Sequence, residues 1–167
     1  FQKINGFGYY FLPNGIELQD AYMENSNGNV YYFNKQGKQL INVYFMDDNK
    51  QWHYFDKNGT MANKGMTTIH INGEEIVQYF NQDGVQAKDQ FITTSDGKMY
   101  YFSDDSGDMI SNQFKKLADG SWAYFGSDGS AIKGSQQIKG QALYFDDDYR
   151  QIKGREKVDT QGLIRYY

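Results

Sequence analysis

Adjacent aromatic residues recur along the chain at nearly constant spacing, and the polar residues and glycines between them follow the same period. Alignment on a Tyr-Phe pair gives seven copies and an altered eighth: Tyr10-Phe11, Tyr32-Phe33, Tyr54-Phe55, Tyr79-Phe80, Tyr101-Phe102, Tyr124-Phe125, Tyr144-Phe145 and Tyr166-Tyr167. The steps between them are 22, 22, 25, 22, 23, 20 and 22 residues. A period in this range is typical of a solenoid or another repeat array.

Glycines at two distances from each Phe indicate tight turns. The first group lies five residues before the Phe: Gly6, Gly28, Gly97, Gly120, Gly140 and Gly162. The second group follows the Phe by four residues, or by five for the last one named: Gly15, Gly37, Gly59, Gly84, Gly129 and Gly107. Tyr149 is the exception in this second group. Many of these glycines follow Asn or Asp, and such pairs supply the positive φ angles of hairpin turns.

Short runs of β-branched and aromatic residues lie between the turns, for example 91–94 and 98–102, and read as strands. No segment of ten or more residues carries an apolar stripe at helical spacing without an interrupting glycine. We therefore expect an all-β chain in which each repeat is one short hairpin. Because a lone hairpin is marginal in water, the hairpins should stack into a β-solenoid.

The domain prediction is a single array of about eight units over residues 1–167. The array begins and ends in mid-repeat and no start signal precedes it, so we expect an excised piece of a longer protein. Side chains alternate across a strand, so each pair should turn its Phe inward to join neighbouring hairpins and leave its Tyr available. The residue before the pair varies between repeats and is expected to be partly exposed.

Composition narrows the class of partner. The chain holds 15 Tyr, 12 Phe and 2 Trp, which excludes a disordered segment. A net charge of -4 provides no basic patch for a phosphate backbone, so no nucleic acid is expected. No run of about 18 apolar residues occurs, so no membrane insertion is expected. The absence of cysteine suits an exported protein and removes disulfides and thiolate metal sites.

Two groups of residues are candidates for binding. Trp52 and Trp122 stand two positions before the Tyr of a pair, where an indole beside a phenol is either packing or half of an aromatic platform. Gln and Lys two residues apart on a strand point to the same side and offer amide and ammonium groups. They occur as Gln86 with Lys88 and as Gln151 with Lys153, with a partial copy at Gln39.

Catalysis and metal binding find little support in the sequence. His53 and His70 do not recur in register with a serine or carboxylate, and the acidic residues concentrate in turns. The turn at Asp56 resembles the start of an EF-hand loop, but no Glu stands at the twelfth position. We expect no active site, metal or cofactor within these residues.

The recurrent Tyr-Tyr-Phe-x-x-x-Gly of residues 31–37, with the Gln-x-Lys of residues 86–88, resembles the glucan-binding repeats in domain V of bacterial glucansucrases. These enzymes include glucosyltransferases and dextransucrases. The resemblance implies a non-catalytic, secreted or cell-surface module that holds dextran-type α-glucan for a linked, sucrose-dependent glucosyltransferase domain. It further implies that a tyrosine stacks on a sugar ring while Gln and Lys bond its hydroxyls.

Carried onto this chain, the resemblance implies two complete carbohydrate-binding sets. The first is Gln86 and Lys88 with Tyr100 or Tyr101, and the second is Gln151 and Lys153 with Tyr166. Residues 17–19, 61–63 and 109–111 lack the polar pair and are interpreted as spacers, and the repeat of residues 30–37 as framework. Asp89 replaces the glycine expected after Lys88, which changes the backbone requirement there.

Two other functions stay open. Related repeats bind choline on teichoic acid in cell-wall anchors, although choline favours a cage of several aromatics and only two Trp are present. Similar repeats also form receptor-binding arrays in clostridial toxins, and a purely structural spacer is a further alternative.

Overall fold

The computed structural model describes residues 1–154, 156–158, 162 and 164–166. This part of the chain consists of strands and turns without a helix, which confirms the predicted all-β fold. It divides into two compact units, Phe1–Ala87 and Lys88–Tyr167, each described by itself.

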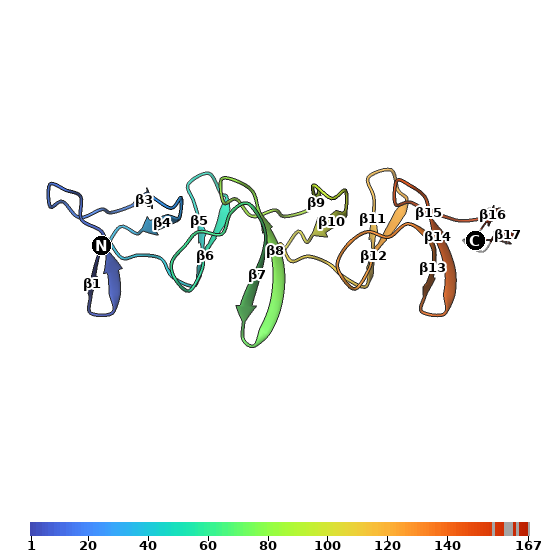
Figure 1. Cartoon of the computed structure of the whole chain (residues 1–167), viewed down its shortest axis with the longest axis horizontal. Coiled ribbons are helices and arrows are strands. Elements are labelled where there is room, and N and C mark those ends of the chain that lie inside the picture. The colour runs from blue at the N-terminus through green and yellow to red at the C-terminus, as the bar shows by residue number, and fades with distance from the viewer. Residues whose placement is uncertain (155, 159–161, 163, 167) are drawn as a thin grey trace. The chain divides into compact units, whose positions relative to one another are not determined.

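Unit 1 is a series of four antiparallel hairpins, each of two strands (Figure 1). Its strands are β1 (Gln2–Ile4), β2 (Phe7–Tyr9), β3 (Ala21–Glu24), β4 (Val30–Phe33), β5 (Val43–Met46), β6 (Trp52–Phe55), β7 (Gly65–Ile71) and β8 (Glu74–Phe80). The β7–β8 hairpin is the longest because its strands pair over seven residues.

Unit 2 continues the same pattern. Its strands are β9 (Gln90–Thr93), β10 (Met99–Phe102), β11 (Gln113–Lys116), β12 (Trp122–Phe125), β13 (Gly134–Ile138), β14 (Gln141–Phe145), β15 (Gln151–Ile152), β16 (Glu156–Val158) and β17 (Ile164–Tyr166). Consecutive strands pair as hairpins, and β15 adds a third strand to β13 and β14.

In each repeat, the Phe of the pair forms a β-bridge to a residue further along the chain. We call the Phe of each pair the core phenylalanine, and the residue that forms a β-bridge to it further along the chain the bridge residue. The bridge residues of the seven repeats are Glu17, Gln39, Met61, Gln86, Met109, Ala131 and Gln151. The bridge residue follows the core phenylalanine by six positions, or by seven in the repeat of Phe102. It therefore has the same backbone environment in every repeat.

Between the core phenylalanine and the bridge residue, the chain makes a tight turn, which an Asn or Asp side chain holds in most repeats and Ser103 holds in the repeat of Phe102. In the third repeat, Asp56 Oδ1 accepts hydrogen bonds from the backbone N–H groups of Asn58 and Thr60, at 2.8 and 2.9 Å. Gly59 completes the turn at φ +77°, in the left-handed region that favours glycine. The second glycine group, with Tyr149 in its last place, occupies this position in each repeat, which we call the trailing position.

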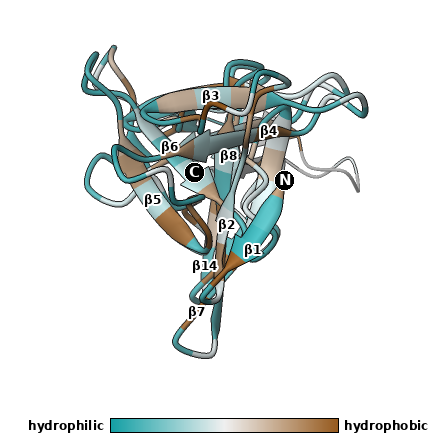
Figure 2. Cartoon of the chain, turned by 90° about the vertical axis from the view of Figure 1, so that its left-hand side faces the viewer, coloured by the Kyte–Doolittle hydropathy of each residue, from teal (hydrophilic) through white to brown (hydrophobic). Residues whose placement is uncertain are grey.

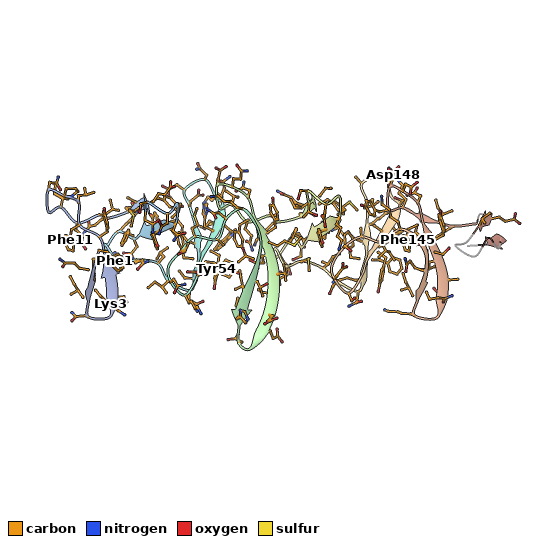
Figure 3. All side chains as sticks on the ribbon, in the orientation of Figure 1. Phe1, Lys3, Phe11, Tyr54, Phe145 and Asp148 are labelled. Atoms are coloured by element: carbon orange, nitrogen blue, oxygen red, sulfur yellow. The ribbon has the colours of Figure 1, made fainter. Side chains whose placement is uncertain are left out.

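The core phenylalanines are the centre of each junction between repeats. Phe33, Phe55, Phe80, Phe102, Phe125 and Phe145 are fully buried, at 0% exposure. Figure 3 shows Phe145 and Tyr54 among the side chains inside their units, whereas Asp148 lies on a turn. Brown, hydrophobic segments likewise follow strands such as β5, and the turns are mainly hydrophilic (Figure 2).

In four repeats the tyrosine of the pair is buried as well, which differs from the expectation that it stays available, whereas Tyr10, Tyr79 and Tyr144 are half-buried. Tyr32, Tyr54, Tyr101 and Tyr124 are all less than one-tenth exposed. The reason is that each hairpin has neighbours on both faces: the ring of Tyr32 lies 6.3 Å from that of Phe55 in the next repeat. Both members of the pair therefore join hairpins.

The residue before the pair is less uniform than expected. His53, Gln78, Tyr100 and Ala123 are buried at this position, whereas Tyr31 and Leu143 are half-buried. We call this residue the variable residue. Only its neighbours in the adjacent repeats decide which of the two states occurs.

Candidate functional site

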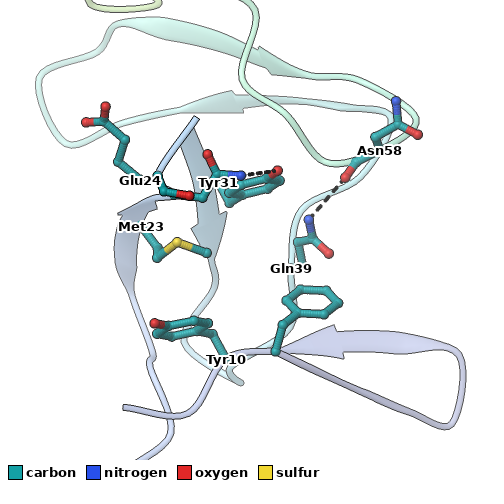
Figure 4. A pocket seen from close by; sticks show the side chains of 9 residues that line it. Tyr10, Met23, Glu24, Tyr31, Gln39 and Asn58 are labelled. Atoms are coloured by element: carbon teal, nitrogen blue, oxygen red, sulfur yellow. Dashed lines mark hydrogen bonds between the residues drawn. The ribbon is translucent and has the colours of Figure 1, made fainter. Parts of the chain in front are cut away.

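A cavity in unit 1 lies where three consecutive repeats meet. Its volume is about 530 Å³. It is lined by Phe1, Tyr10, Met23, Glu24, Asn25, Ser26, Tyr31, Gln39 and Asn58 (Figure 4). Two tyrosines, an acid and several amides thus face one space.

Two tyrosines from different repeats line this cavity, and the side chain of Met23 lies between them in the view of Figure 4. Tyr10 follows β2 in the first repeat, and Tyr31 is the variable residue on β4 of the second (Figure 4). Asn25 Nδ2 donates to the Tyr31 hydroxyl at 3.2 Å, while Asn25 Oδ1 accepts from the backbone N–H groups of its own turn. The Tyr31 ring is therefore held in place by a side chain that is itself fixed.

Gln39 brings an amide to the cavity from the bridge position. It is 8% exposed, and its backbone N–H donates to the carbonyl of Gly8 at 2.9 Å. Its side-chain Nε2 donates to the backbone carbonyl of Asn58 at 3.2 Å. A Cβ at Gly59 would overlap this amide, so the glycine in the trailing position of the next repeat makes room for Gln39.

A second cavity, of about 320 Å³, lies in unit 2. It is lined by Phe114, Trp122, Gln141, Leu143, Gln151 and Lys153. The structure thus brings together the predicted Gln151 and Lys153 with Trp122, the predicted platform, which is 39% exposed. Tyr166 lies in β17, and its side chain is outside the described part of the chain.

The other predicted set is distributed over both units. Gln86 belongs to unit 1, where it is 7% exposed and its Nε2 donates to Gln78 Oε1 at 2.7 Å. Lys88 belongs to unit 2, and its Nζ donates to the carbonyl of Asp105 at 2.6 Å. Tyr100 and Tyr101 are buried in unit 2.

The Tyr101 hydroxyl is engaged on both sides. It donates to Asp89 Oδ1 at 2.5 Å and accepts a hydrogen bond from Lys115 Nζ. Burial and the bond to Asp89 raise the pKa of Tyr101. Trp52, the other predicted platform, is half-buried on β6 in unit 1.

A third cavity, of about 240 Å³, is aromatic and acidic. It lies in unit 1 and is lined by Asp20, Tyr22, Tyr32, Phe45, Asp47, Asp48 and Asn49. The ring of Tyr32 stands 4.8 Å from that of Tyr22 and 4.4 Å from that of Phe45. Burial and the hydrogen bond to Asp20 raise the pKa of Tyr32 well above its ordinary value.

Sequence reasoning missed the first cavity. Its repeat was interpreted as framework because Gln39 lacks a lysine two residues later, and Tyr10, Glu24 and Asn25 carried no signal of their own. The available signal was Gln39 itself, in the register of Gln86 and Gln151. Within the described residues, there is no group of three His, Asp or Glu side chains suited to a metal ion, and no helix with the length and apolarity needed to cross a membrane.

The serial aromatic hairpins define a β-hairpin repeat domain. The chain matches the choline-binding repeat family over residues 1–44, 64–114 and 132–167, and a putative cell wall binding repeat over residues 44–61. It belongs to the choline-binding repeat family.

Proteins similar in sequence define a narrower group of relatives for this chain. It is 44% identical to Glucosyltransferase-I of Streptococcus mutans serotype c, over 99% of this chain and 11% of that protein. It spans 6% and 7% of two further streptococcal glucosyltransferases, Glucosyltransferase-I of Streptococcus downei and Glucosyltransferase-S of Streptococcus mutans. These likenesses confirm the predicted resemblance to the repeat domain of glucansucrases.

Solved structures share the fold. Choline binding protein F from Streptococcus pneumoniae superposes with a TM-score of 0.77 at 19% identity, over 98% of this chain and 56% of that chain. Truncated alternansucrase from Leuconostoc mesenteroides gives a TM-score of 0.61 at 26% identity, over 73% of this chain and 11% of that chain. The expected solenoid of serial hairpins is confirmed by these neighbours.

Proposed function

We propose that the chain is a non-catalytic α-glucan-binding module. The observation that carries this proposal is the first cavity, which two tyrosines and the hydrogen-bonded amide of Gln39 line together. A pyranose ring has apolar C–H faces and a rim of hydroxyls. Aromatic rings with a placed amide match that surface, as in other small-molecule sites.

In the first cavity, Tyr10 and Tyr31 stack on a glucosyl ring, and Gln39 bonds its hydroxyls. In the second cavity, Trp122 provides the aromatic face, and Gln151 and Lys153 provide the hydrogen bonds. The set of Gln86 and Lys88 with Tyr100 or Tyr101, and the part of Tyr166, stay predictions.

The proposal extends to the parent protein. The matching relatives are named glucosyltransferases and are far longer than this chain, so we infer a covalently linked catalytic domain that acts on sucrose. The module holds the polymer product near that domain at the bacterial cell surface. Each site is shallow, but a polymer that occupies two sites gains affinity by a factor on the order of 10² because its second contact is intramolecular.

Affinity electrophoresis in gels that contain dextran tests the proposal. The 167-residue chain should be retarded relative to the same gel without polysaccharide, and the double variant Gln39→Ala/Gln151→Ala should migrate freely. Unretarded wild-type chain in both α-1,6 and α-1,3 glucan gels would overturn the proposal.

The third cavity favours a second candidate function, the binding of a quaternary ammonium group such as choline. Its walls are the rings of Tyr22, Tyr32 and Phe45, and its rim carries the carboxylates of Asp20 and Asp47. Aromatic faces and negative charge together attract such cations. Retention on a choline resin with elution by millimolar choline, lost in Tyr22→Ala, would favour this function over glucan binding.

A further inference from the structure

One repeat of unit 2 contains the counterpart of the first cavity, but a side chain fills it. The sixth repeat, that of Phe125, corresponds position by position to the second repeat, that of Phe33. Its bridge residue is Ala131, where the second repeat has Gln39. Its variable residue is Ala123, which pairs with Lys115 as Tyr31 pairs with Met23. Two of the side chains that line the first cavity from the second repeat, Tyr31 and Gln39, are thus replaced by methyl groups.

The residue at the trailing position of the following repeat also differs between the two junctions. It is Gly59 after the second repeat and Tyr149 after the sixth. The two turns are otherwise the same: the N–H of Gly59 donates to Asp56 O at 2.9 Å, and the N–H of Tyr149 donates to Asp146 O at 3.0 Å. Their φ angles are +77° and +64°. The backbone is therefore kept, and only the side chain differs.

The Tyr149 side chain lies over the two alanines. It packs against the cluster of Tyr101, Ala123, Phe125 and Ala131, and Tyr101 is the counterpart of the cavity wall Tyr10. The Tyr149 hydroxyl donates to the carbonyl of Gly97 at 3.0 Å, and Lys133 Nζ stands 4.3 Å from the ring centroid. The ring thus packs at the junction whose counterpart in unit 1 holds Tyr31, Gln39 and the first cavity.

In other repeats, the trailing residue is a glycine where the bridge residue of the preceding repeat is large. A Cβ at the trailing position would overlap the bridge residue of the preceding repeat at Gly37 with Glu17, at Gly59 with Gln39, at Gly84 with Met61 and at Gly129 with Met109. The bridge residue is large in all four cases. Where the bridge residue is small, at Ala131, the trailing residue is Tyr149. The two positions fill one space between them.

Tyr149 is one of several non-glycine residues in the left-handed region, and its φ of +64° equals that of Lys50 and Lys64 in unit 1. A tyrosine in the left-handed region costs about 1 kcal/mol or more relative to glycine, and strained residues persist where the surrounding structure holds them. Here the contacts of the ring offset that cost.

From these observations we propose that Tyr149 is a built-in plug that closes a glucan pocket, and that the trailing residue decides whether a junction binds sugar. The inference rests on the proposed function. A bridge glutamine with a trailing glycine gives an open junction, as at Gln39 and Gly59. A bridge alanine with a trailing tyrosine gives a closed one, so the number of sugar sites in the array is set by this pair of positions.

The first test transfers the plug to unit 1 and needs no sugar. Gly59→Tyr alone places a ring against Gln39 and should lower Tm strongly. The triple variant Tyr31→Ala/Gln39→Ala/Gly59→Tyr reproduces the sixth repeat and should regain several degrees of that loss. In the control, Gly84→Tyr faces Met61 and should not be rescued by the same two alanines. A triple variant less stable than Gly59→Tyr would overturn the proposal that Tyr149 acts as a plug.

The second test opens the closed junction. Ala123→Tyr/Ala131→Gln/Tyr149→Gly is introduced into the Gln39→Ala/Gln151→Ala background, whose own pockets are disabled, and circular dichroism checks its fold. Retardation in dextran gels should return. A folded variant that stays unretarded, although wild type is retarded, overturns the inference alone. If wild type is not retarded, the proposed function fails, and the Tm comparison still decides whether Tyr149 is a plug.

Discussion

Gln39 donates a side-chain hydrogen bond of 3.2 Å to the backbone carbonyl of Asn58, 19 residues further along the chain. The bond joins the bridge position of the second repeat to the trailing turn of the third. The first cavity is lined by Gln39 and Asn58, so the proposed sugar site is a property of a junction and not of a single repeat.

Replacement of the bridge residue should separate binding from stability. Gln39→Ala removes one placed amide and should weaken binding of isomaltotriose by about tenfold, the value of one net hydrogen bond. Met61→Ala, at the same position of the next repeat, should leave binding unchanged but lower the free energy of unfolding by about 2 to 5 kcal/mol, because Met61 is buried. Titration calorimetry and urea unfolding measure the two effects, and equal losses of binding would contradict the assignment.

The trailing glycine of the third repeat should matter for more than its φ angle. Gly15→Ala and Gly59→Ala both place a side chain in the left-handed region, at φ +83° and +77°. A Cβ at Gly15 meets nothing within 4 Å, whereas one at Gly59 overlaps the Gln39 amide. Gly15→Ala should therefore cost about 1 kcal/mol. Gly59→Ala should cost more and also weaken glucan binding. Equal effects on stability and no effect on binding would show that Gly59 serves the turn alone.

Tryptophan fluorescence should report on the second cavity. Trp52 and Trp122 are the two tryptophans of the chain, and Trp122 lines this cavity with Gln151 and Lys153. Addition of isomaltotriose should shift the emission of wild type and of Trp52→Phe, because a sugar replaces water at the Trp122 indole. The shift should disappear in Trp122→Phe. A shift that survives in Trp122→Phe but not in Trp52→Phe would place the sugar elsewhere.

Asp89 adopts the left-handed backbone conformation that favours glycine, and it also provides a hydrogen-bond acceptor. Substitutions should separate these two contributions to stability. Its φ is +48°, and its carboxylate accepts from the Tyr101 hydroxyl. Asp89→Gly loses the acceptor but relieves the backbone, whereas Asp89→Ala loses the acceptor and keeps the strain. We expect Asp89→Ala to be less stable than Asp89→Gly by about 1 kcal/mol. Asp89→Asn should be close to wild type, since Asn42 accepts from Tyr54 in the same way. Chemical denaturation measures the series, and the reverse order of Ala and Gly would refute the explanation.

Low pH should lower the free energy of unfolding of unit 2, because it protonates Asp119. Hydrogen bonds from Ser121 and then Arg150 lower the pKa of the Asp119 carboxyl from 3.8 to about 2. Because the folded-state pKa lies below the unfolded one, the stabilisation is complete above about pH 4 and is lost as the pH falls toward 2. The stability difference between wild type and Asp119→Asn should therefore be present at pH 7 and shrink near pH 2. Arg150→Gln should show a smaller effect with the same trend, and a difference independent of pH would contradict the assignment.

The sequence predicted those parts of the fold that depend on local interactions. Asp56 and Gly59 form their turn with neighbours two to four positions away, so the same residue types recur wherever the turn recurs. Phe33 and its equivalents are read as core because a large apolar side chain at a fixed period must be buried in every hairpin. For the second cavity, Gln151, Lys153 and Trp122 were each named from the sequence before the structure placed them together.

The sequence by itself thus determined the hairpin, its turns and the period of the core, because a repeated local pattern has one local solution. Only the tertiary structure decided which residues at each junction are buried. Tyr31 is half-buried and His53 is buried at the same position of consecutive repeats, since exposure depends on side chains about 20 residues away. For the same reason, the tyrosine at position 149 is explained only by the structure, where its side chain packs against the cluster that contains Ala131.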